Sequence, residues 1–440
     1  MSKVDKKVGI IGGGFAGLTA AYELSKRGIA VTVFEADSAV GGLAGTFDVQ
    51  GERLEKFYHH WFNNDLHVLD LARELGLGDR ILTRFSRTGM YFNKNFFKLS
   101  TPMDVLRFTP LPFFDRIRLG LLALKARRVK DWRSLENLTA EEWLIQLGGK
   151  KVYEVVWKPL LDGKFGPYAS KVSAVWFWNK LKLRGGSRGS GGAEELVYFK
   201  GGFTAITDAL VAAIEKNGGQ VLLSTPVQGV EVQGGKVCGV KTAAGITPVD
   251  AVIATPALPM IADWLAPHTS ADYAKQLRSI EYIANVCLVL ELDRSLSSTY
   301  WLNVNDPGFP FVGVIEHTNF EPTSTYGGRH IVYLSKYLPE SDRLYQMSDT
   351  EFRDFCVTHL QRMFPEFKTE WILQSHTWRA THSQPIVAKH YSQMIPAEQS
   401  PVNGFYICTM AQIYPEDRGT NYAVREGRKV GQMLAGKLAA

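Results

Sequence analysis

The chain opens with short apolar runs separated by glycines. Residues 8–11 (Val-Gly-Ile-Ile) have the composition of a buried parallel strand, and Gly12-Gly13-Gly14-Phe15-Ala16-Gly17 follows at once. Residues 18–26 carry apolar side chains at helical spacing, and Gly28 is a typical helix stop. A second apolar run, residues 30–34, ends at Glu35. The pattern therefore predicts a strand, a glycine turn, a helix and a second strand.

The residue types in this turn suit a dinucleotide. Gly12 permits a tight turn, Gly14 lets backbone N–H groups approach a pyrophosphate, and Gly17 permits close packing of the helix on the strand. The helix N-terminus adds partial positive charge. Glu35 can accept hydrogen bonds from a ribose diol, which implies a free 2′-hydroxyl rather than a 2′-phosphate. An ordinary glycine-rich turn is the alternative, and the complete set of offsets favours nucleotide binding.

Beyond the first unit, helical and strand patterns alternate along the chain. Apolar periodicity predicts helices within 66–84 and 134–183, and a hairpin across 90–99. Residues 184–192 are rich in glycine and serine and predict a surface loop. Residues 276–395 predict mostly the strands of an antiparallel sheet.

Two later segments return to the nucleotide-binding pattern. Residues 201–256 predict a helix, a strand and two alternating runs joined by Gly234-Gly235. A last apolar strand at 404–408 precedes a helix at 423–438. The expected organisation is a discontinuous nucleotide-binding domain of residues 1–65, 200–275 and 400–440, with a second domain of residues 66–199 and 276–399 that combines a helical part with the antiparallel sheet.

Composition restricts the class of protein. The 440 residues are 45% hydrophobic and 21% charged, which is typical of a globular protein and excludes a disordered chain. The net charge of +6 mildly favours anionic ligands and does not imply nucleic acid. Four separated cysteines without a CxxC pair indicate neither a disulfide framework nor a zinc site. No run of about 18 apolar residues and no secretion signal is present, so a cytoplasmic location is expected.

The segment 103–133 is aromatic and basic. It holds eight Lys or Arg against three Asp, a local net charge of +5. A solvated helix that turns Leu119, Leu122 and Val129 inward is the favoured interpretation. Peripheral contact with an anionic membrane, on its inner face, is the alternative that this charge pattern leaves open.

The sequence after Glu35 adds a second glycine motif. Gly41-Gly42-Leu43-Ala44-Gly45-Thr46 resembles the GG-x-x-x-T motif of the superfamily of FAD-dependent amine oxidases, protoporphyrinogen oxidases and carotene desaturases. The resemblance implies FAD as cofactor and an α/β fold, with a Rossmann-type, glutathione-reductase-like FAD-binding domain and a discontinuous α+β substrate domain. Many members have Arg after the two glycines. Leu43 stands there in this chain, so the backbone must bind more of the phosphate.

The resemblance also implies the cofactor-binding residues. In these enzymes the amides at the start of the last helix face the flavin, and Thr420 and Asn421 are suitable caps for that helix. The expected set is Gly12, Gly14, Phe15, Ala16, Gly17, Glu35, Ala36, Gly41, Gly42, Leu43, Ala44, Val227, Met410, Gly419, Thr420, Asn421 and Tyr422. The usual Gly-Asp pair is replaced by Thr409-Met410, so the acid normally found there is absent.

That departure introduces a partial resemblance to UDP-galactopyranose mutase. Tyr414, Asp417 and Arg418 resemble the tyrosine-rich acidic loop that precedes the last helix of the mutase. The sequence His60-Trp61-Phe62 is similar to the mutase's His-x-Phe stretch beside the flavin.

His59 and His60 are the candidate catalytic residues, because imidazole titrates near neutrality and can transfer a proton. A pair of packed, hydrogen-bonded histidines is the alternative. His382 and the cluster Lys389-His390-Tyr391 are further candidates, for which core or rim positions are favoured. Metal binding is disfavoured because no carboxylate accompanies the histidines at ligand spacing.

The combined expectation is an FAD-dependent oxidoreductase that moves a hydride from a substrate carbon to flavin N5. Its partner would be a small-molecule or lipophilic substrate. A mutase-like isomerase that binds a nucleotide sugar through Arg184, Arg188 or Arg418 is one alternative. A flavin-binding protein without turnover is another.

Overall fold

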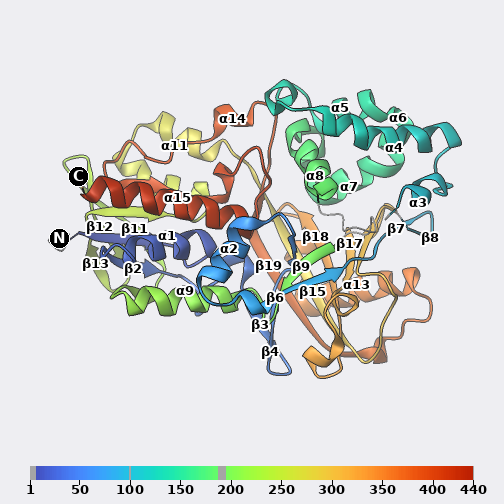
Figure 1. The fold of residues 1–440 in the computed structure, drawn as a ribbon, viewed down its shortest axis with the longest axis horizontal. Coiled ribbons are helices and arrows are strands. Elements are labelled where there is room, and N and C mark those ends of the chain that lie inside the picture. Colours follow the sequence, from blue (N-terminus) through green and yellow to red (C-terminus); the bar gives the residue numbers. More distant parts are fainter. Residues whose placement is uncertain (1–5, 99–100, 187–194, 440) are drawn as a thin grey trace.

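A parallel sheet forms the first layer of the molecule. The computed structural model describes residues 6–98, 101–186 and 195–439. Five strands pair in the order β10-β2-β1-β14-β20, and every neighbouring pair is parallel (Figure 1). They are β1 (Lys7–Ile11), β2 (Ala30–Phe34), β10 (Gln220–Leu222), β14 (Ala251–Ala254) and β20 (Phe405–Ile407). The α/β Rossmann-type fold expected from the sequence is confirmed.

Both faces of this sheet are covered. Val8 and Ile10 pack with helices α1 (Phe15–Ser25), α9 (Thr204–Lys216) and α15 (Thr420–Ala439) in one core. Ile11 and Phe34 belong to a second core with Val240. That residue lies in a layer of three antiparallel strands, β11 (Val227–Gln233), β12 (Lys236–Thr242) and β13 (Gly245–Pro248). Burial on both faces explains why these strands read as continuous apolar runs.

Glycines bring the first and last helices together. A Cβ on Gly427 of α15 would overlap the carbonyl oxygen of Ala16 in α1, and one on Gly431 would lie 2.9 Å from the oxygen of Ala20. Residues four apart lie on one face of a helix, so the two glycines form a flat strip against α1. This packing fixes the N-terminus of α15 beside the glycine turn that precedes α1.

A larger mixed sheet forms the second part of the molecule. Its strands follow the order β19-β15-β18-β17-β16-β7-β8. They are β7 (Thr88–Phe92), β8 (Asn95–Lys98), β15 (Tyr282–Leu292), β16 (Trp301–Val304), β17 (Gly313–Glu316), β18 (His330–Leu338) and β19 (Ile372–Pro385). Helix α13 (Asp349–Met363) packs on one face through a core shared with β15 and β18.

The antiparallel sheet expected from residues 276–395 is confirmed, because the neighbouring pairs among β15 to β19 are all antiparallel. The hairpin of β7 and β8 comes from outside that segment and joins the sheet beside β16. Strand β7 runs parallel to β16, with Leu302 opposite Gly89. The two strands come from segments about two hundred residues apart, so no short turn sets their relative direction. The boundaries expected between the two domains, near residues 65, 199, 275 and 399, stay a prediction.

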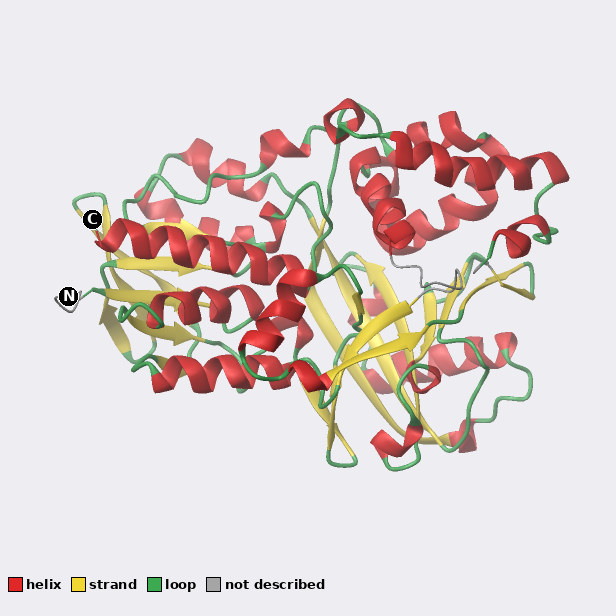
Figure 2. Cartoon of the chain, viewed as in Figure 1, coloured by secondary structure: helices red, strands yellow, loops and turns green. Residues whose placement is uncertain are grey.

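A lobe of helices stands above the mixed sheet (Figure 2). It contains α3 (Pro102–Leu106), α4 (Phe113–Arg128), α5 (Ala140–Gly148), α6 (Lys150–Val152), α7 (Lys158–Phe165) and α8 (Ala174–Gly186). Since α8 continues through Gly186, the expectation of a loop from 184 is wrong for its first three residues; 187–192 lie outside the described residues.

Short strands missed by the sequence analysis link the parts. Strand β9 (Glu195–Phe199) pairs with β5 (Trp61–Phe62) and β6 (Ile81–Phe85). A hairpin of β3 (Thr46–Val49) and β4 (Glu52–Glu55) follows the second glycine motif. Each strand has at most five residues, which is too short for a clear alternating pattern.

Candidate functional site

The first glycine turn has the geometry of a phosphate-binding loop. Gly12 has a φ of +103°, and a Cβ there would overlap the hydroxyl of Thr255. A Cβ on Gly17 would overlap the carbonyl oxygen of Gly12, so only glycine allows this approach of helix to turn. Phe15 is buried beneath the turn, and Ala16 packs against α15.

The two glycine motifs meet. The amide of Gly41 donates to the carbonyl of Gly13 at 3.0 Å. Gly14 and Gly42 face each other across this contact: a Cβ on Gly42 would lie 3.4 Å from the Cα of Gly14, and a Cβ on Gly14 would meet nothing nearer than the Cα of Gly42, at 3.9 Å. The motifs thus line one space with backbone alone, where side chains would intrude on a diphosphate.

The 3-10 turn Gly42–Ala44 completes this loop. Gly41 and Gly42 have φ values of +123° and +57°, which glycine adopts readily. Ala44 is buried and Leu43 is half-buried. Leu43 brings no charge to the loop, so this turn offers an anion only backbone groups at that position.

Glu35 lies at the adjoining end of β2. Its carboxylate accepts the amide of Gly13 at 2.6 Å and the amide of Asp37 at 2.8 Å. The neighbouring Ala36 is exposed. The carbonyl of Glu35 accepts the amide of Thr225 at 2.7 Å, and this bond places Val227, two residues later, at the same end of the site. The expected nucleotide-binding residues are therefore gathered around one turn.

The start of α15 forms the other end of the site. Trp61 Nε1 donates to Thr420 Oγ1 at 2.6 Å. Asn421 Oδ1 accepts the amide of Val68 at 3.1 Å and so caps α2 (Leu66–Glu74). The expectation that Asn421 caps its own helix is wrong, because the side chain satisfies an orphan N–H of a neighbouring helix instead.

The remaining residues expected at this end border α15 or the last strand. Gly419 is exposed, and a Cβ there would meet no atom within 4 Å. Tyr422 is half-buried in the first turn of α15. Met410 begins a short 3-10 turn after β20.

His59 and His60 lie between the two parts of the molecule. His59 Nδ1 is 2.5 Å from the carbonyl oxygen of Phe57, and burial lowers the pKa of His59 to about 4, with a smaller contribution from Arg418. The imidazole of His59 is therefore neutral at neutral pH. His60 Nδ1 is 3.0 Å from the hydroxyl of Tyr300, and its ring lies edge-on to Trp301.

The other candidates named from the sequence, His382, Lys389 and Tyr391, have neighbours other than His59 and His60. Burial lowers the pKa of His382, whose ring lies edge-on to Tyr282. Lys389 forms an ion pair of 3.9 Å with Glu142 at the surface. Tyr391 is buried and donates to the carbonyl of Ala411 at 2.9 Å, which is a core role.

A charged cluster missed by the sequence analysis adjoins the start of α15. Asp417 is buried, forms an ion pair of 2.5 Å with Lys180 of α8, and accepts from Gln384 at 3.1 Å. Arg418 donates to Gln384 Oε1 at 3.1 Å and to the hydroxyl of Tyr337 at 3.2 Å. We call Lys164, Lys180 and Arg418 the basic cluster.

Lys164 approaches this group from α7. Its Nζ lies 4.7 Å from the ring centre of Tyr337 and 5.5 Å from that of Trp176. The cluster and its partners Tyr337 and Gln384 come from α7, α8, β18, β19 and the loop before α15, so no local spacing in the sequence could indicate it. Of the arginines proposed to bind a diphosphate, Arg418 is in the cluster, Arg188 lies outside the described residues, and of Arg184 only the backbone is described.

These charges shift the pKa values of their neighbours. Burial alone would raise the pKa of Asp417, but Lys180, Lys164 and Arg418 hold it well below its usual range. Burial would likewise raise the pKa of Tyr337, and Lys164 and Arg418 lower it. Burial lowers the pKa of Lys164. The site therefore holds a tyrosine hydroxyl biased toward releasing its proton beside an amine biased the same way.

Metal-binding clusters and membrane-spanning helices are both absent from the described ranges. Residues 6–98, 101–186 and 195–439 contain no group of three or more His, Cys, Asp or Glu side chains able to hold a metal ion. Within the same ranges, no helix combines the length and the apolar character needed to cross a bilayer.

Comparison with known proteins identifies the family. A sequence profile for flavin containing amine oxidoreductases matches residues 15–432. The chain belongs to this family. The resemblance seen in the two glycine motifs is thus confirmed, and the cofactor is FAD, which the paired glycine loops and the N-terminus of α15 fit.

Individual relatives are distant. The zeta-carotene desaturase of Arabidopsis thaliana is 25% identical over 178 residues, which are 35% of this chain and 32% of the desaturase. The matched part thus spans about a third of the length of that curated relative. A protein of Exiguobacterium sp. 255-15, provisionally named a protoporphyrinogen oxidase, has a similar structure with a TM-score of 0.79, 17% identity and coverage of 98% and 99% of the two chains. Reduced UDP-galactopyranose mutase gives a TM-score of 0.75 at 13% identity, over 98% of this chain and 94% of the mutase.

Proposed function

We propose that the protein is an FAD-dependent oxidoreductase that oxidises a carbon centre of a small-molecule or lipophilic substrate. The observation that carries this proposal is the meeting of Gly14 and Gly42 at one end of a site whose other end is the N-terminus of α15. When bound, FAD would supply the hydride acceptor, its N5 atom, for this oxidation.

The residues of the chain have separate tasks in this proposal. The backbone of the two glycine loops would bind the diphosphate, and Glu35 would bind the ribose once its oxygens exchange partners. The amides at the start of α15 would face the flavin pyrimidine and stabilise negative charge there. Trp61 keeps this helix end in place through Thr420.

The two histidines indicated by the sequence receive different roles in this proposal. His59 is neutral and bonded to Phe57, which gives it a positioning role rather than that of a general acid. We place His60 at the substrate end, where Tyr300 orients its ring. Both roles are proposals.

The visible spectrum of the purified protein is the first test. Flavin absorption bands are expected, and Gly14→Val should remove them because the new side chain fills the space between Gly14 and Gly42. Gly120→Ala is the matched control, since a Cβ there meets no atom within 4 Å. A colourless protein that does not take up FAD would contradict the proposal.

Anaerobic addition of candidate substrates tests the chemistry. Bleaching of the oxidised flavin would support the oxidoreductase. The mutase-like alternative is favoured by Arg418, which can hold a diphosphate, and predicts turnover of a nucleotide sugar only after reduction with dithionite. A flavin that no reductant bleaches would indicate a binding protein without turnover.

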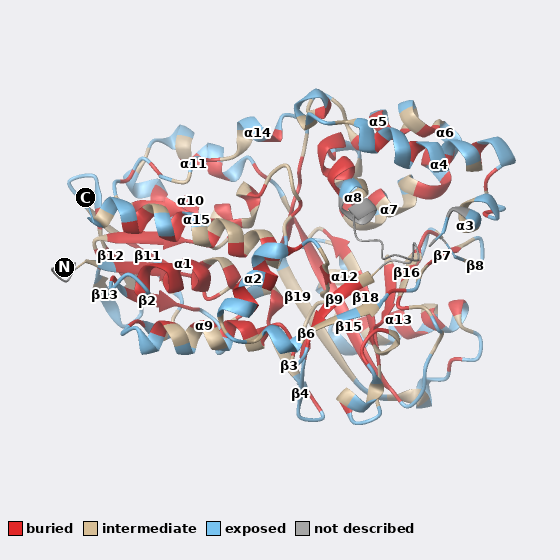
Figure 3. Ribbon diagram, in the orientation of Figure 1, coloured by how far each residue is buried: buried red, intermediate tan, exposed pale blue. Residues whose placement is uncertain are grey.

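We also propose that the lobe contacts an anionic membrane through α4. Leu119 and Leu122 are buried, as a solvated helix requires. The opposite face nevertheless exposes large apolar side chains at helical spacing, namely Phe113, Phe114, Ile117, Leu121 and Leu124. Figure 3 shows α4 exposed along the outside of the lobe. A face of this kind on a helix that is already packed favours insertion among lipid chains.

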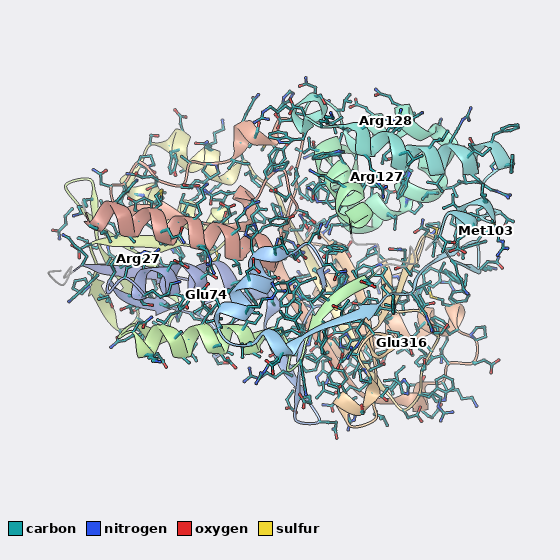
Figure 4. The ribbon with its side chains drawn as sticks, in the orientation of Figure 1. Arg27, Glu74, Met103, Arg127, Arg128 and Glu316 are labelled. Atoms are coloured by element: carbon teal, nitrogen blue, oxygen red, sulfur yellow. The ribbon has the colours of Figure 1, made fainter. Side chains whose placement is uncertain are left out.

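The charges beside this face match an anionic surface. Arg118, Lys125 and Arg128 are exposed on α4, while Asp115 is buried. Figure 4 marks Arg127 and Arg128 on the lobe, with Met103 of α3 at its far end. Met103 is also exposed. Basic residues around exposed aromatic side chains are typical of peripheral binding to anionic lipids.

Sedimentation with lipid vesicles tests this contact. Binding is expected to vesicles of phosphatidylglycerol and phosphatidylcholine, weakly or not at all to phosphatidylcholine alone, and at least tenfold less after Phe113→Ser with Phe114→Ser. Phe355→Ser, on the exposed side of α13, is the control. Equal binding by both variants would contradict the proposal, as would concentration-dependent self-association through α4 without vesicle binding.

A further inference from the structure

The basic cluster holds more positive charge than its own acids balance. Asp417 contacts Lys180 and is the carboxylate in direct contact with the cluster. Among the described residues, neither Lys164 nor Arg418 forms an ion pair with a carboxylate: Arg418 donates to two neutral acceptors, and Lys164 lies over aromatic rings. Asp65 lies further off, near Lys180, and burial raises the pKa of Asp65 to about 6.

Leaving cations without a counterion away from water is unfavourable. A partly buried ammonium or guanidinium group loses hydration that neutral acceptors restore only in part. A bound anion would restore it. Lys164 and Arg418 both contact the ring or hydroxyl of Tyr337, so a single anionic group beside Tyr337 can reach both.

An unpaired donor in the same place supports this conclusion. The ring of Trp176 lies 5.5 Å from the Nζ atoms of both Lys164 and Lys180. Trp176 is 6% exposed, and its Nε1 has no hydrogen-bond acceptor among the described residues. Buried indole N–H groups normally have an acceptor.

The cluster adjoins the flavin end of the site. Arg418 precedes the first residue of α15 by two positions and influences the ionisation of His59. Helix α7, which carries Lys164, packs beside β18, which carries Tyr337 (Figure 1). A substrate that reaches the N-terminus of α15 would therefore lie within reach of the cluster.

We propose that the basic cluster binds an anionic group of the substrate, a carboxylate or a phosphate, so that the enzyme acts on an acid and discriminates against free amines. This inference rests on the proposed function, because it takes the space at the N-terminus of α15 as the place where the substrate binds. A cationic amine would be repelled by Lys164, Lys180 and Arg418. The planar donors of Arg418 suit either carboxylate or phosphate oxygens.

Binding of simple probes to the full-length purified chain tests the inference. Benzoate, inorganic pyrophosphate and benzylamine are titrated while the tryptophan fluorescence and the flavin absorption are recorded. Benzoate or pyrophosphate is expected to perturb the signals with saturation, and benzylamine is not. Benzoate alone would assign a carboxylate site, and pyrophosphate alone a phosphate site.

Variants connect the binding to the cluster. Lys164→Gln should weaken anion binding at least fivefold, and Lys164→Arg should restore most of it. Lys158→Gln is the matched control, because Lys158 lies on the same helix and pairs with Asp162 at 2.5 Å on the surface. Arg418→Gln provides a second variant if Lys164→Gln does not fold.

The outcomes separate this inference from the proposed function. Equal anion affinity in Lys164→Gln and Lys158→Gln, absence of saturable anion binding, or tighter binding of benzylamine than of benzoate would overturn the inference even in a protein with full flavin content. A colourless protein that still loses anion binding in Lys164→Gln would overturn the proposed function and leave the anion site in place.

Discussion

The two ends of the site are built in opposite ways. At the phosphate end, backbone groups of Gly14 and Gly42 line the space, and the chain segments that carry them are less than thirty residues apart. At the other end, the basic cluster consists of side chains from elements spread over more than 250 residues. In the proposed function, the first end would bind a group common to many nucleotides, and the second would distinguish one substrate from another.

This difference predicts how each end responds to change. A backbone-lined loop fails when a side chain is added, because the surrounding main chain cannot move aside. A cluster of charged side chains is destabilised when one partner of an ion pair is removed, because the other partner then stays buried without a counterion.

Gly17→Ala should have the largest effect. The new Cβ would overlap the carbonyl oxygen of Gly12, and the free energy of unfolding should fall by about 3 kcal/mol. Denaturant titration measures the loss, with Gly120→Ala in α4 as the control that leaves stability unchanged or slightly higher. Equal midpoints for the two variants would show that the helix can shift away from the turn.

Glu55, the last residue of β4, should make the free energy of unfolding depend on pH. Its carboxylate accepts from Tyr198 and from the amide of Phe203, yet burial raises the pKa of Glu55 to about 7. Because the folded pKa lies above the unfolded value, this contribution to stability is complete below pH 4.5 and is lost as the pH rises through 7.

The size of this effect is roughly 3 kcal/mol, by conversion of the pKa shift. The free energy of unfolding of the native protein should fall between pH 5 and pH 8. In Glu55→Gln this fall should be smaller by about 3 kcal/mol. Glu52→Gln, which is exposed on β4, is the control. An unchanged pH dependence in Glu55→Gln would remove Glu55 as its origin.

Asp417→Asn should destabilise the cluster end by about 2 kcal/mol at pH 7, because Lys180 loses its partner. The pKa of Asp417 is lowered, so its contribution is present above the unfolded pKa and is lost as the pH falls. The difference in the free energy of unfolding between Asp417→Asn and the native protein should therefore become smaller below about pH 4. Asp263→Asn, which breaks an exposed pair with Arg278, should change stability by less than about 1 kcal/mol. A difference that does not become smaller in acid would contradict the assignment.

Asn421→Ala should have the smallest effect, about 1 kcal/mol, because it leaves the amide of Val68 without an acceptor. Asn421→Asp keeps an acceptor and should retain more stability in thermal unfolding. Identical losses in both variants would show that this hydrogen bond does not stabilise α2.

Much of the phosphate end was predicted from the sequence, because its parts are local. The run of residues 8–11, the spacing of Gly12, Gly14 and Gly17, and the position of Glu35 each depend on near neighbours. The second glycine motif indicated the family and FAD for the same reason. The histidines were identified as residues of interest, but only the structure places His59 against Phe57 and gives it a neutral ring.

Local sequence thus determined the opening βαβ unit, the glycine loops and the kind of coenzyme, since strand, turn and helix preferences act over a few residues. Tertiary structure alone decided that β7 runs parallel to β16, that Asn421 caps α2, and that Lys164, Lys180 and Arg418 converge on Tyr337. The physical reason is that contacts between segments far apart in the chain depend on how whole elements pack, and packing leaves no periodic pattern in any one of them.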